Sequence, residues 1–399
     1  MSGIGIQLQK LLRPNSFTGS LWAFSLSIIA SGSPWIISFL SILVLHRILQ
    51  PILEEGPLTL FSTTIAHVYA VALVLFGGLQ FVLNRFAVGC IRGKREDRII
   101  PSCLPALLFT GGLSFAIGFV LFGLLIPESW QFKVSAISLL IYVSMIFVAT
   151  NFLSVLPKSR GIVPGFLMGY GIALFAVWAG ARAFGVAGGL AGFSAGHLIL
   201  LMILIWRLQA ETGNRPPDQA DWKFLRIFKR FPSMAWCGIL LYLGIWIDKF
   251  LFWHLSSQGQ AVSGVMRASP AYDPVFFLSL LSVVPALAFF FLRFETKIAG
   301  SLDQFQLAID GQGTLDEIRE EKFAMVQSLR RGLTQSITVQ AVVTVGLLIS
   351  TPGILEWLGL STGKSSFVLI TLIGASLLSL YLAMLKVLFQ FDDRRGALY

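Results

Sequence analysis

Residues 134–156 read VSAISLLIYVSMIFVATNFLSVL, a stretch in which no side chain carries a charge. A helix of this length crosses the ~30 Å hydrocarbon layer of a bilayer, because each helical residue adds about 1.5 Å. Similar stretches recur along the chain, and 55% of its 399 residues are hydrophobic whereas only 13% are charged. Soluble domains have roughly 25% charged residues, so the composition excludes an ordinary soluble enzyme and indicates a membrane protein.

Counting these stretches predicts the fold class. We expect an all-α, polytopic transmembrane protein with about ten spans, since each stretch is long enough for one crossing. The predicted spans are 21–45, 59–83, 102–126, 134–156, 162–181, 184–206, 231–255, 274–292, 333–349 and 366–391.

Basic residues near the spans predict the orientation, because Lys and Arg stay on the cytoplasmic side. If the N-terminus is cytoplasmic, each outer segment contains only one basic residue, and these are Arg47, Lys133, Arg182, Arg267 and Lys364. Lys249 lies within a span, and all other Lys and Arg residues fall in inner segments. We therefore expect both termini in the cytoplasm. The net charge of +10 then reflects topology and does not indicate nucleic-acid binding.

The order of spans and polar segments predicts four regions. Residues 1–20 resemble an interfacial amphipathic helix, and residues 21–206 form a first bundle of six spans. A cytoplasmic linker, 207–230, contains two prolines. Residues 231–399 form a second bundle of four spans with a cytoplasmic insert, 300–332. Within the insert, Thr314 and Glu317 have the spacing of a helix capping box. The insert is either a surface helix or a docking face for a cytosolic partner.

Small residues and prolines interrupt the apolar spans. Glycines recur every four residues in 162–206, which favours close packing of helix backbones. Gly32 and Pro34 interrupt the first span, and Pro285 interrupts the eighth. A proline removes one backbone hydrogen bond and exposes a carbonyl, so we expect these breaks either to line a substrate path or to serve packing.

Asp248 and Lys249 lie inside the seventh span. A charge in hydrocarbon costs about 3 kcal/mol, so it is usually kept where water, a partner or a substrate meets it. We predict that Asp248 lines a wet path. Lys249 either lines it too or extends to the outer membrane surface.

Other polar residues have two interpretations each. Arg293, Glu295 and Lys297 form a cluster at the inner face that acts as an anchor or as a gate. Asn151 and His197 lie deep in their spans and are more typical of hydrogen bonds between helices than of ligand contacts. Asn151 is also a candidate residue of the substrate path.

Catalytic and cofactor motifs are not evident. The segment from Gly359 to Ser365 resembles a phosphate-binding loop but is one residue short between its glycines, and no strand precedes it. The cysteines, Cys90, Cys103 and Cys237, lack metal-ligand spacing. We predict no enzyme, no catalytic residue, no metal and no cofactor.

Several segments together are similar to a known family, the PelG family of the Pel exopolysaccharide system. The resemblance extends from residue 3 to about Arg395 and rests on segments in both halves. They are Gly3–Leu12, Ser31–Trp35, Leu243–Lys249, Ser269–Asp273, Arg293–Thr296 and Leu329–Gly332.

The resemblance implies a flippase-like architecture of the multidrug/oligosaccharidyl-lipid/polysaccharide superfamily, with two six-helix bundles. It implies export of a partly deacetylated, galactosamine-rich polymer. The implied partners are a cytosolic glycosyltransferase, PelF, and two membrane proteins, PelD and PelE. Family members continue for two more spans after the segment Asp392–Arg395, so we expect an incomplete second bundle.

From these observations we expect transport of an exopolysaccharide across the inner membrane within a synthase–export complex. One alternative is an ion-coupled exporter of small molecules, with Asp248 at the ion site. Another is a membrane scaffold that recruits the glycosyltransferase. A membrane-embedded glycosyltransferase is disfavoured because the soluble segments are too short for a nucleotide-sugar domain.

Overall fold

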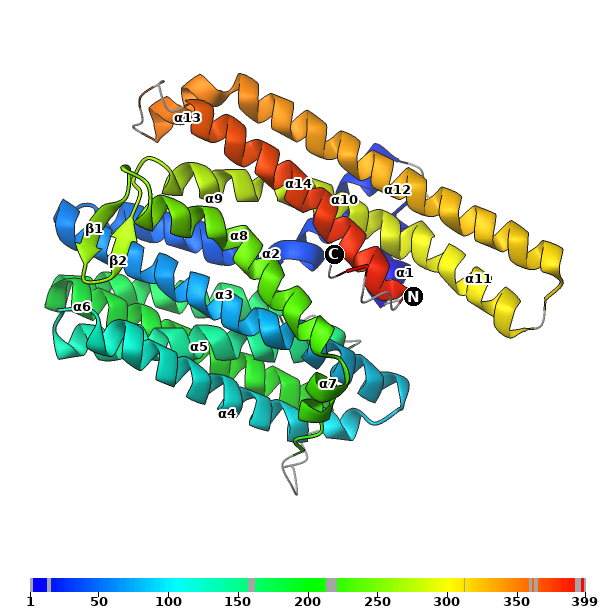
Figure 1. Cartoon of the computed structure of the whole chain (residues 1–399), viewed down its shortest axis with the longest axis horizontal. Helices are drawn as coiled ribbons and strands as arrows, with labels where there is room; N and C mark the ends of the chain where they lie inside the picture. The colour runs from blue at the N-terminus through cyan, green and yellow to red at the C-terminus, as the bar shows by residue number, and fades with distance from the viewer. Residues whose placement is uncertain are drawn as a thin grey trace. The chain divides into compact units, whose positions relative to one another are not determined.

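The computed structural model describes residues 3–12, 16–156, 162–212, 221–311, 313–358, 361, 365–391 and 396–397. Most of the segment that resembles a phosphate-binding loop, part of the linker and Asp392–Arg395 lie outside these residues. The described chain is helical apart from one short β-hairpin, so the all-α, polytopic fold class is confirmed (Figure 1).

The elements follow one another with few loops. The first part of the chain forms α1 (Gly3–Leu12), α2 (Phe17–Leu49), α3 (Glu55–Arg92), η1 (Glu96–Arg98), α4 (Ile99–Gly118), η2 (Phe119–Leu124), α5 (Trp130–Val155), α6 (Ile162–Thr212), α7 (Phe224–Arg230) and α8 (Pro232–His254). The second part forms β1 (Gln260–Ser263), β2 (Met266–Ala268), α9 (Asp273–Leu281), α10 (Val283–Arg293), η4 (Phe294–Ile298), α11 (Ala299–Asp310), α12 (Leu315–Ile349), α13 (Thr351–Trp357) and α14 (Ser365–Gln390).

Contacts group the chain into two compact units. Unit 1 comprises Met1–Ser33 and Pro270–Asp393, and unit 2 comprises Pro34–Ser269 and Arg394–Tyr399. Unit 1 thus holds α1, the first segment of α2 and α9 to α14. Unit 2 holds the rest of α2, α3 to α8 and the hairpin. The predicted division into bundles at the linker 207–230 stays a prediction.

The number of membrane spans follows from three observations. Among the described residues, eight helices are long and apolar enough to cross a membrane. A ninth span is the pair Phe17–Ile29 and Pro34–Leu49, which passes the same test only as a bent pair. The kinked helix α6 also contains two of the predicted spans, joined at Phe184 and Gly185, whose backbone angles are not helical. The structure is that of a multi-pass membrane protein with eight or nine candidate spans among the described residues, and the count of about ten stays a prediction.

Close approach of glycines shows that α6 folds back on itself. A Cβ atom added at Gly188 would collide with the carbonyl oxygen of Gly180, and one at Gly192 with that of Ala176. A Cβ atom at Gly196 would collide with the side chain of Ala173. These pairs match an antiparallel hairpin in which each glycine meets a residue progressively farther from the turn. The prediction that the glycines serve backbone packing is confirmed.

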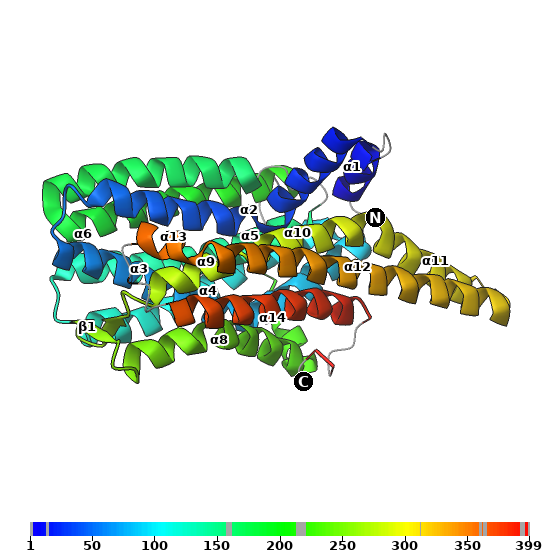
Figure 2. The ribbon, with the colours of Figure 1, turned by 90° about the horizontal axis from the view of Figure 1, so that it is seen from above.

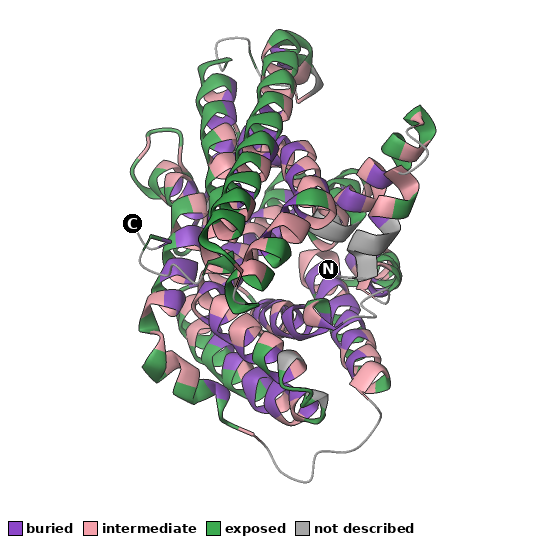
Figure 3. Ribbon diagram, turned by 90° about the vertical axis from the view of Figure 1, so that its right-hand side faces the viewer, coloured by how far each residue is buried: buried purple, intermediate pink, exposed green. Residues whose placement is uncertain are grey.

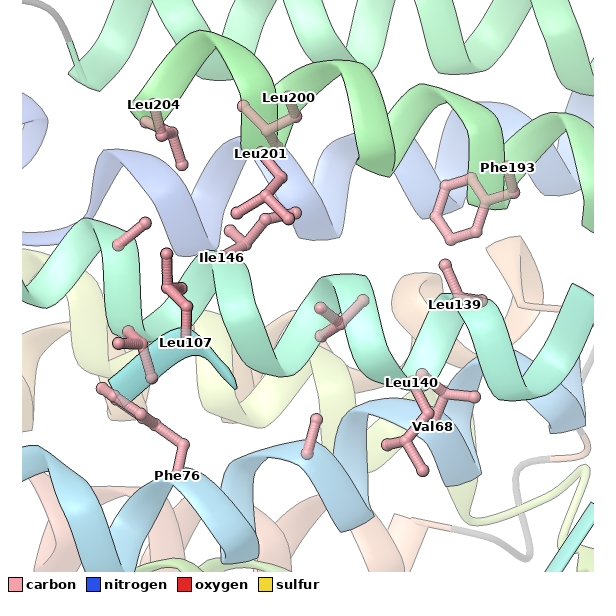
Figure 4. Close-up of a cluster of buried hydrophobic side chains, with 14 of the residues drawn as sticks. Val68, Phe76, Leu107, Leu139, Leu140, Ile146, Phe193, Leu200, Leu201 and Leu204 are labelled. Carbon is pink, nitrogen blue, oxygen red and sulfur yellow. The ribbon is translucent and has the colours of Figure 1, made fainter. Parts of the chain in front are cut away.

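Unit 2 has its core around α5. Figure 4 shows α5 between α3 and α6, with Leu139 and Leu140 in the same cluster as Val68 of α3 and Phe193 of α6. Ile146, farther toward the C-terminal end of α5, belongs to the same cluster, as does Leu201 of α6. Because α5 contacts α3, α4 and α6, most of its positions are apolar on every side, which explains the uncharged sequence of 134–156.

Unit 1 is built on α10, α12 and α14, which contact one another (Figure 2). The predicted insert contains most of α11 and the first half of α12. From Leu315 onward the insert and the predicted ninth span form one continuous helix, α12, because no residue between them breaks it. Its first turn has the predicted capping box, since Thr314 Oγ1 accepts from Glu317 N and Glu317 Oε2 accepts from Thr314 N. The N-terminal helix α1 buries Leu8 against Ala23 and Leu292.

A two-stranded antiparallel hairpin replaces the outer loop predicted after α8. The hairpin turns at Gly264, whose φ is +52°, a conformation that glycine adopts without strain. Arg267 donates from Nε to the carbonyl of Trp253 at 2.6 Å and from Nη2 to that of Gly259 at 2.8 Å. This arginine therefore satisfies a carbonyl in the last turn of α8, a group that has no partner within the helix.

Exposed apolar side chains cover the outer faces of the helices. In Figure 3 the buried positions run in stripes along the helices, and the exposed positions lie between these stripes. Phe175, Met202 and Ile349 are among the large apolar residues with high exposure. In water such a surface would aggregate, but in a bilayer it faces lipid.

The α6 hairpin gives a stability prediction. Gly192→Ala places a Cβ atom against the backbone of Ala176, so we expect a loss of about 1–3 kcal/mol in the free energy of unfolding. Denaturant titration of the purified protein in detergent measures it. Gly171→Ala on the same helix is the control, since nothing lies within 4 Å of its added Cβ atom. Equal unfolding midpoints for the two variants would contradict the hairpin packing.

Candidate functional site

A groove with a mainly apolar lining and five polar side chains runs between α12 and α14 in unit 1. Ser336, Gln340 and Thr344 follow one another at intervals of four residues and therefore share one face of α12. Thr344 Oγ1 lies 2.9 Å from Ser376 Oγ of α14, and Gln340 Nε2 donates to Thr344 Oγ1 at 3.2 Å. A cavity of about 370 Å³ lies along these residues. It is lined by Leu333, Ser336, Ile337, Gln340, Ala341, Thr344, Val345, Ser376, Leu377, Ser379, Leu380 and Ala383.

The groove contains a buried acceptor with unused capacity. Gln340 is only 3% exposed, and its Oε1 atom has no hydrogen-bond partner among the described residues. Leaving such an acceptor unmet costs about 1–3 kcal/mol. Its place in the lining of a cavity provides room for water or a ligand hydroxyl to donate to it.

A second polar site lies in unit 2, next to the break at Pro34. Ser38 Oγ donates to the Pro34 carbonyl at 2.7 Å, and Tyr170 donates to Ser38 Oγ at 2.7 Å. The Tyr69 hydroxyl lies 2.6 Å from that of Tyr170 and 3.1 Å from His197 Nε2. The hydroxyl chain therefore connects α2, α3 and both arms of α6.

This network has fewer hydrogens than contacts when His197 is neutral. His197 Nδ1 lies 2.8 Å from the Phe193 carbonyl, so that nitrogen carries the hydrogen. Both ends of the chain are then carbonyl acceptors, the other being that of Pro34. Each of Ser38, Tyr69 and Tyr170 supplies one hydrogen, which leaves one contact without a donor unless His197 gains a second proton.

Asp248 and Lys249 differ in their surroundings on α8. Asp248 is half-buried, and its Oδ1 accepts from the backbone N–H of Lys249 at 2.7 Å. Lys249 is fully buried, so the alternative in which it extends to the outer surface is wrong. Its Nζ lies 5.3 Å from the ring centroid of Trp246 and 4.9 Å from that of Trp253, a cation–π arrangement.

A histidine of α3 completes the aromatic surroundings of this lysine. The ring of His67 stacks on Trp253 with centroids 4.2 Å apart. The His67 Nδ1 lies 2.9 Å from the Thr63 carbonyl and therefore donates to it. Trp253 thus contacts both an imidazole of α3 and an ammonium group of α8.

The other predicted path residues are in separate places. Asn151 is 8% exposed and donates from Nδ2 to the Gln80 carbonyl at 3.1 Å, a bond between α5 and α3. Gly32 and Pro34 lie half-buried in α2, and Pro285 lies half-buried in the first turn of α10. Whether these residues line a path stays a prediction.

The predicted inner-face cluster divides in two. Arg293 and Lys297 line one cavity of unit 1, whereas Glu295 is not in its lining and interacts electrostatically with Lys386 of α14. The division has a local cause, because Phe294–Ile298 form the π-helical turn η4. A π turn changes the angle between successive side chains, so an α-helical projection misplaces them.

The sequence interpretation missed the groove of unit 1. The spacing Ser336-x3-Gln340-x3-Thr344 was the available signal, since i, i+4 and i+8 lie on one face of a helix. Among the described residues no group of three His, Cys, Asp or Glu side chains is placed to hold a metal ion. The chemistry available in the two units is therefore hydrogen bonding by neutral groups and contact with a few charges.

The hydrogen shortage in unit 2 gives a paired prediction. Tyr69→Phe leaves the buried His197 Nε2 without a donor, whereas Tyr170→Phe leaves every remaining contact with a hydrogen. We expect Tyr69→Phe to lower the free energy of unfolding by about 1 kcal/mol more than Tyr170→Phe does. Denaturant titration in detergent compares them. Tyr142→Phe is the control, because Tyr142 has no hydrogen bond in the described part of the chain. Equal losses for Tyr69→Phe and Tyr170→Phe would show that the hydrogens are not short.

Solved transporter structures share this fold. A MATE family multidrug-resistance transporter of the MOP superfamily, in an outward-facing conformation, is similar over 93% of this chain and 83% of its own, with a TM-score of 0.61 and 13% identity. MATE in the bent conformation is similar over 100% of this chain and 86% of its own, with a TM-score of 0.62 and 12% identity. A MOP superfamily transporter from Pyrococcus furiosus, described as having a binding pocket of reverse polarity, has a TM-score of 0.62 at 11% identity, over 93% and 84% of the two chains.

Sequence comparison gives the family. No protein with a curated description matches the chain. The family model for PelG, described as an exopolysaccharide exporter (EPS-E), matches residues 1–399. The fold, the long apolar helices and this match over the whole chain lead to one assignment. The chain belongs to the PelG family of exopolysaccharide exporters.

Proposed function

We propose that the protein moves a Pel-type, galactosamine-rich exopolysaccharide across the bacterial inner membrane as part of a synthase–export complex. Both chain termini lie in the cytoplasm in this proposal, because that orientation places nearly all Lys and Arg residues inside. In this proposal the protein binds and guides the polymer and does not change it chemically. The family assignment supports transport of a polysaccharide.

The groove of unit 1 carries the proposal. Sugar hydroxyls lose their hydrogen bonds to water inside a membrane, which costs several kcal/mol for each unmet group. Gln340, Thr344 and Ser376 offer amide and hydroxyl groups at membrane depth, and the cavity beside them holds about 370 Å³. These neutral groups replace water for a sugar without binding it as tightly as charges would.

Charge and backbone breaks extend the path in this proposal. Asp248 is half-buried in α8 and attracts the ammonium groups of a partly deacetylated polymer. Gly32, Pro34 and Pro285 lie at backbone breaks, where carbonyls without helical partners accept from sugar hydroxyls. Asn151 contributes by fixing α5 against α3, and Lys249 by fixing α8 within its aromatic surroundings.

The first half of α12 offers a place for the cytosolic glycosyltransferase, PelF. Leu315, Phe323 and Val326 are apolar yet 63%, 69% and 49% exposed, and this part of the helix lies in the predicted cytoplasmic insert. An exposed apolar surface outside the lipid layer is typical of a protein interface. PelD and PelE are included in the proposed complex because the family resemblance implies them.

The groove gives the central prediction. Gln340→Leu combined with Thr344→Val removes the amide and one hydroxyl, so we expect export to fall at least about fivefold, since a lost hydrogen bond is worth roughly 1 kcal/mol. Lectin staining of surface polymer, divided by the amount of protein in the membrane, measures it in a strain lacking the native gene. Ile337→Leu, an apolar change in the same lining, is the control. Unchanged export in the double variant would exclude the groove from the path.

Asp248 gives a prediction specific to charge. We expect Asp248→Asn to reduce export of the cationic polymer about tenfold and Asp248→Glu to preserve most of it, since an attraction of ~1.4 kcal/mol is a factor of ten. The same staining assay applies, and Asp221→Asn, at an ion pair with Lys223 outside the predicted spans, is the control. Normal export by Asp248→Asn at a normal protein level would remove Asp248 from the path.

Transport and recruitment assays distinguish the proposed function from the two alternatives, an ion-coupled exporter of small molecules and a membrane scaffold. The proposed function requires that polymer export stop when the glycosyltransferase is deleted and that purified protein in vesicles move no small molecule in response to an ion gradient. Gradient-driven transport by the protein alone would establish an ion-coupled exporter. Recruitment of the glycosyltransferase by a variant that forms no path would establish a scaffold.

A further inference from the structure

A second cavity of unit 1 differs in chemistry from the groove. It measures about 270 Å³ and lies between α12 and the junction of α10 with η4. Three of its lining residues, Arg293, Lys297 and Arg331, are cationic, and none is acidic. The rest of the lining consists of Ile298, Ala324, Gln327, Ser328, Gly332 and Gln335.

The backbone brings the three cations together. Arg293 directly precedes the π turn η4 and Lys297 lies within it, and both line the same cavity, while Glu295 between them interacts with Lys386 on α14. On the facing helix, Gly332 permits the approach of α12, because a Cβ atom there would lie 2.7 Å from Ile298 Cδ1. Arg331, next to this glycine, then reaches the same cavity.

The guanidinium of Arg293 is incompletely satisfied. Its Nε atom is buried and has no hydrogen-bond partner among the described residues, and its Cζ atom lies 5.3 Å from the Phe289 ring centroid. In the described part of the chain no carboxylate forms an ion pair with Arg293, Lys297 or Arg331. The three positive charges that line one cavity repel one another, and a buried charged donor without an acceptor is unfavourable. An anion in the cavity would remove both costs.

The residue types and the position indicate which anion. Arginine presents parallel N–H groups that match phosphate oxygens, and Gln and Ser supply further donors. The lining of α12 extends from Ala324 to Gln335, across the change from its polar first half to its apolar second half. The cavity therefore lies at the membrane–water boundary, the level of phospholipid headgroups.

We propose that this cavity is a binding site for a phosphate group, supplied by an anionic phospholipid headgroup or by a soluble phosphate compound. Arg293 and Arg331 bind the phosphate oxygens, and Lys297 adds charge. The bound group connects α12 to the end of α10 and so stabilises unit 1 at this level. The site is separate from the polysaccharide path and does not rest on the proposed function.

The test uses the purified full chain in nanodiscs. Phosphatidylglycerol retained by the protein over phosphatidylcholine is measured by native mass spectrometry, and inorganic phosphate or pyrophosphate is added to protein in phosphatidylcholine nanodiscs to follow its thermal unfolding. We expect Arg293→Gln with Arg331→Gln to weaken binding of the responsive probe about a hundredfold, roughly tenfold for each lost charged hydrogen bond. Retention of phosphatidylglycerol identifies a lipid headgroup, and stabilisation by phosphate identifies a soluble source.

Two controls keep the result interpretable. Arg319→Gln removes a cation of α12 that pairs with Asp316 at 3.8 Å outside the cavity, and it should leave binding unchanged. Lys297→Gln with Arg331→Gln changes exposed side chains only, so this variant folds even where the Arg293 substitution impairs folding. Binding of neither probe by the wild-type chain, or equal binding by wild type and Lys297→Gln/Arg331→Gln, would overturn the proposal.

Discussion

In hydrocarbon every backbone N–H and C=O must find a partner within the protein, and this constraint determines the architecture. It selects helices, and it also governs the polar side chains that the helices carry. Ser27, Thr64, Thr110 and Ser135 each donate to the carbonyl four residues earlier, at 2.7–2.8 Å. A hydroxyl satisfied in this way adds no polarity to a path. The informative polar groups are therefore those whose bonds cross between helices or remain unmet, such as Gln340.

The presence of the spans was predictable because lipid imposes a length and an apolar composition that are read directly from sequence. The uncharged stretch 134–156 became α5, whose bounds are Trp130–Val155. The glycine spacing in α6 also predicted close packing. The hairpin after α8 was not predicted, because two short strands depend on a positive φ at Gly264 and on the bonds of Arg267. Such features depend on tertiary contacts, which a hydropathy pattern does not contain.

The candidate site was less predictable than the fold, for physical reasons. A charged residue within an apolar span indicates a special environment, but the sequence does not show in which direction its side chain extends. Lys249 was therefore as consistent with the membrane surface as with the aromatic rings of Trp246 and Trp253 that it contacts. The cluster of Arg293, Glu295 and Lys297 was identified, but the π turn that separates their charges is not visible in a 3.6-residue period. The groove residues were visible as a stripe, yet each alone is an ordinary polar residue within a span.

Unit 1 contains two cavities whose chemistry would select different groups. The lining of the groove beside Gln340 and Thr344 carries no charge, so under the proposed function it would accept sugar hydroxyls without repelling the ammonium groups of a partly deacetylated polymer. The cavity at Arg293 and Arg331 is cationic, and the same polymer would be repelled from it. A single polysaccharide path through both is therefore disfavoured by charge alone. The cationic cavity is better suited to holding unit 1 at the headgroup level, and the neutral groove is left for the moving chain.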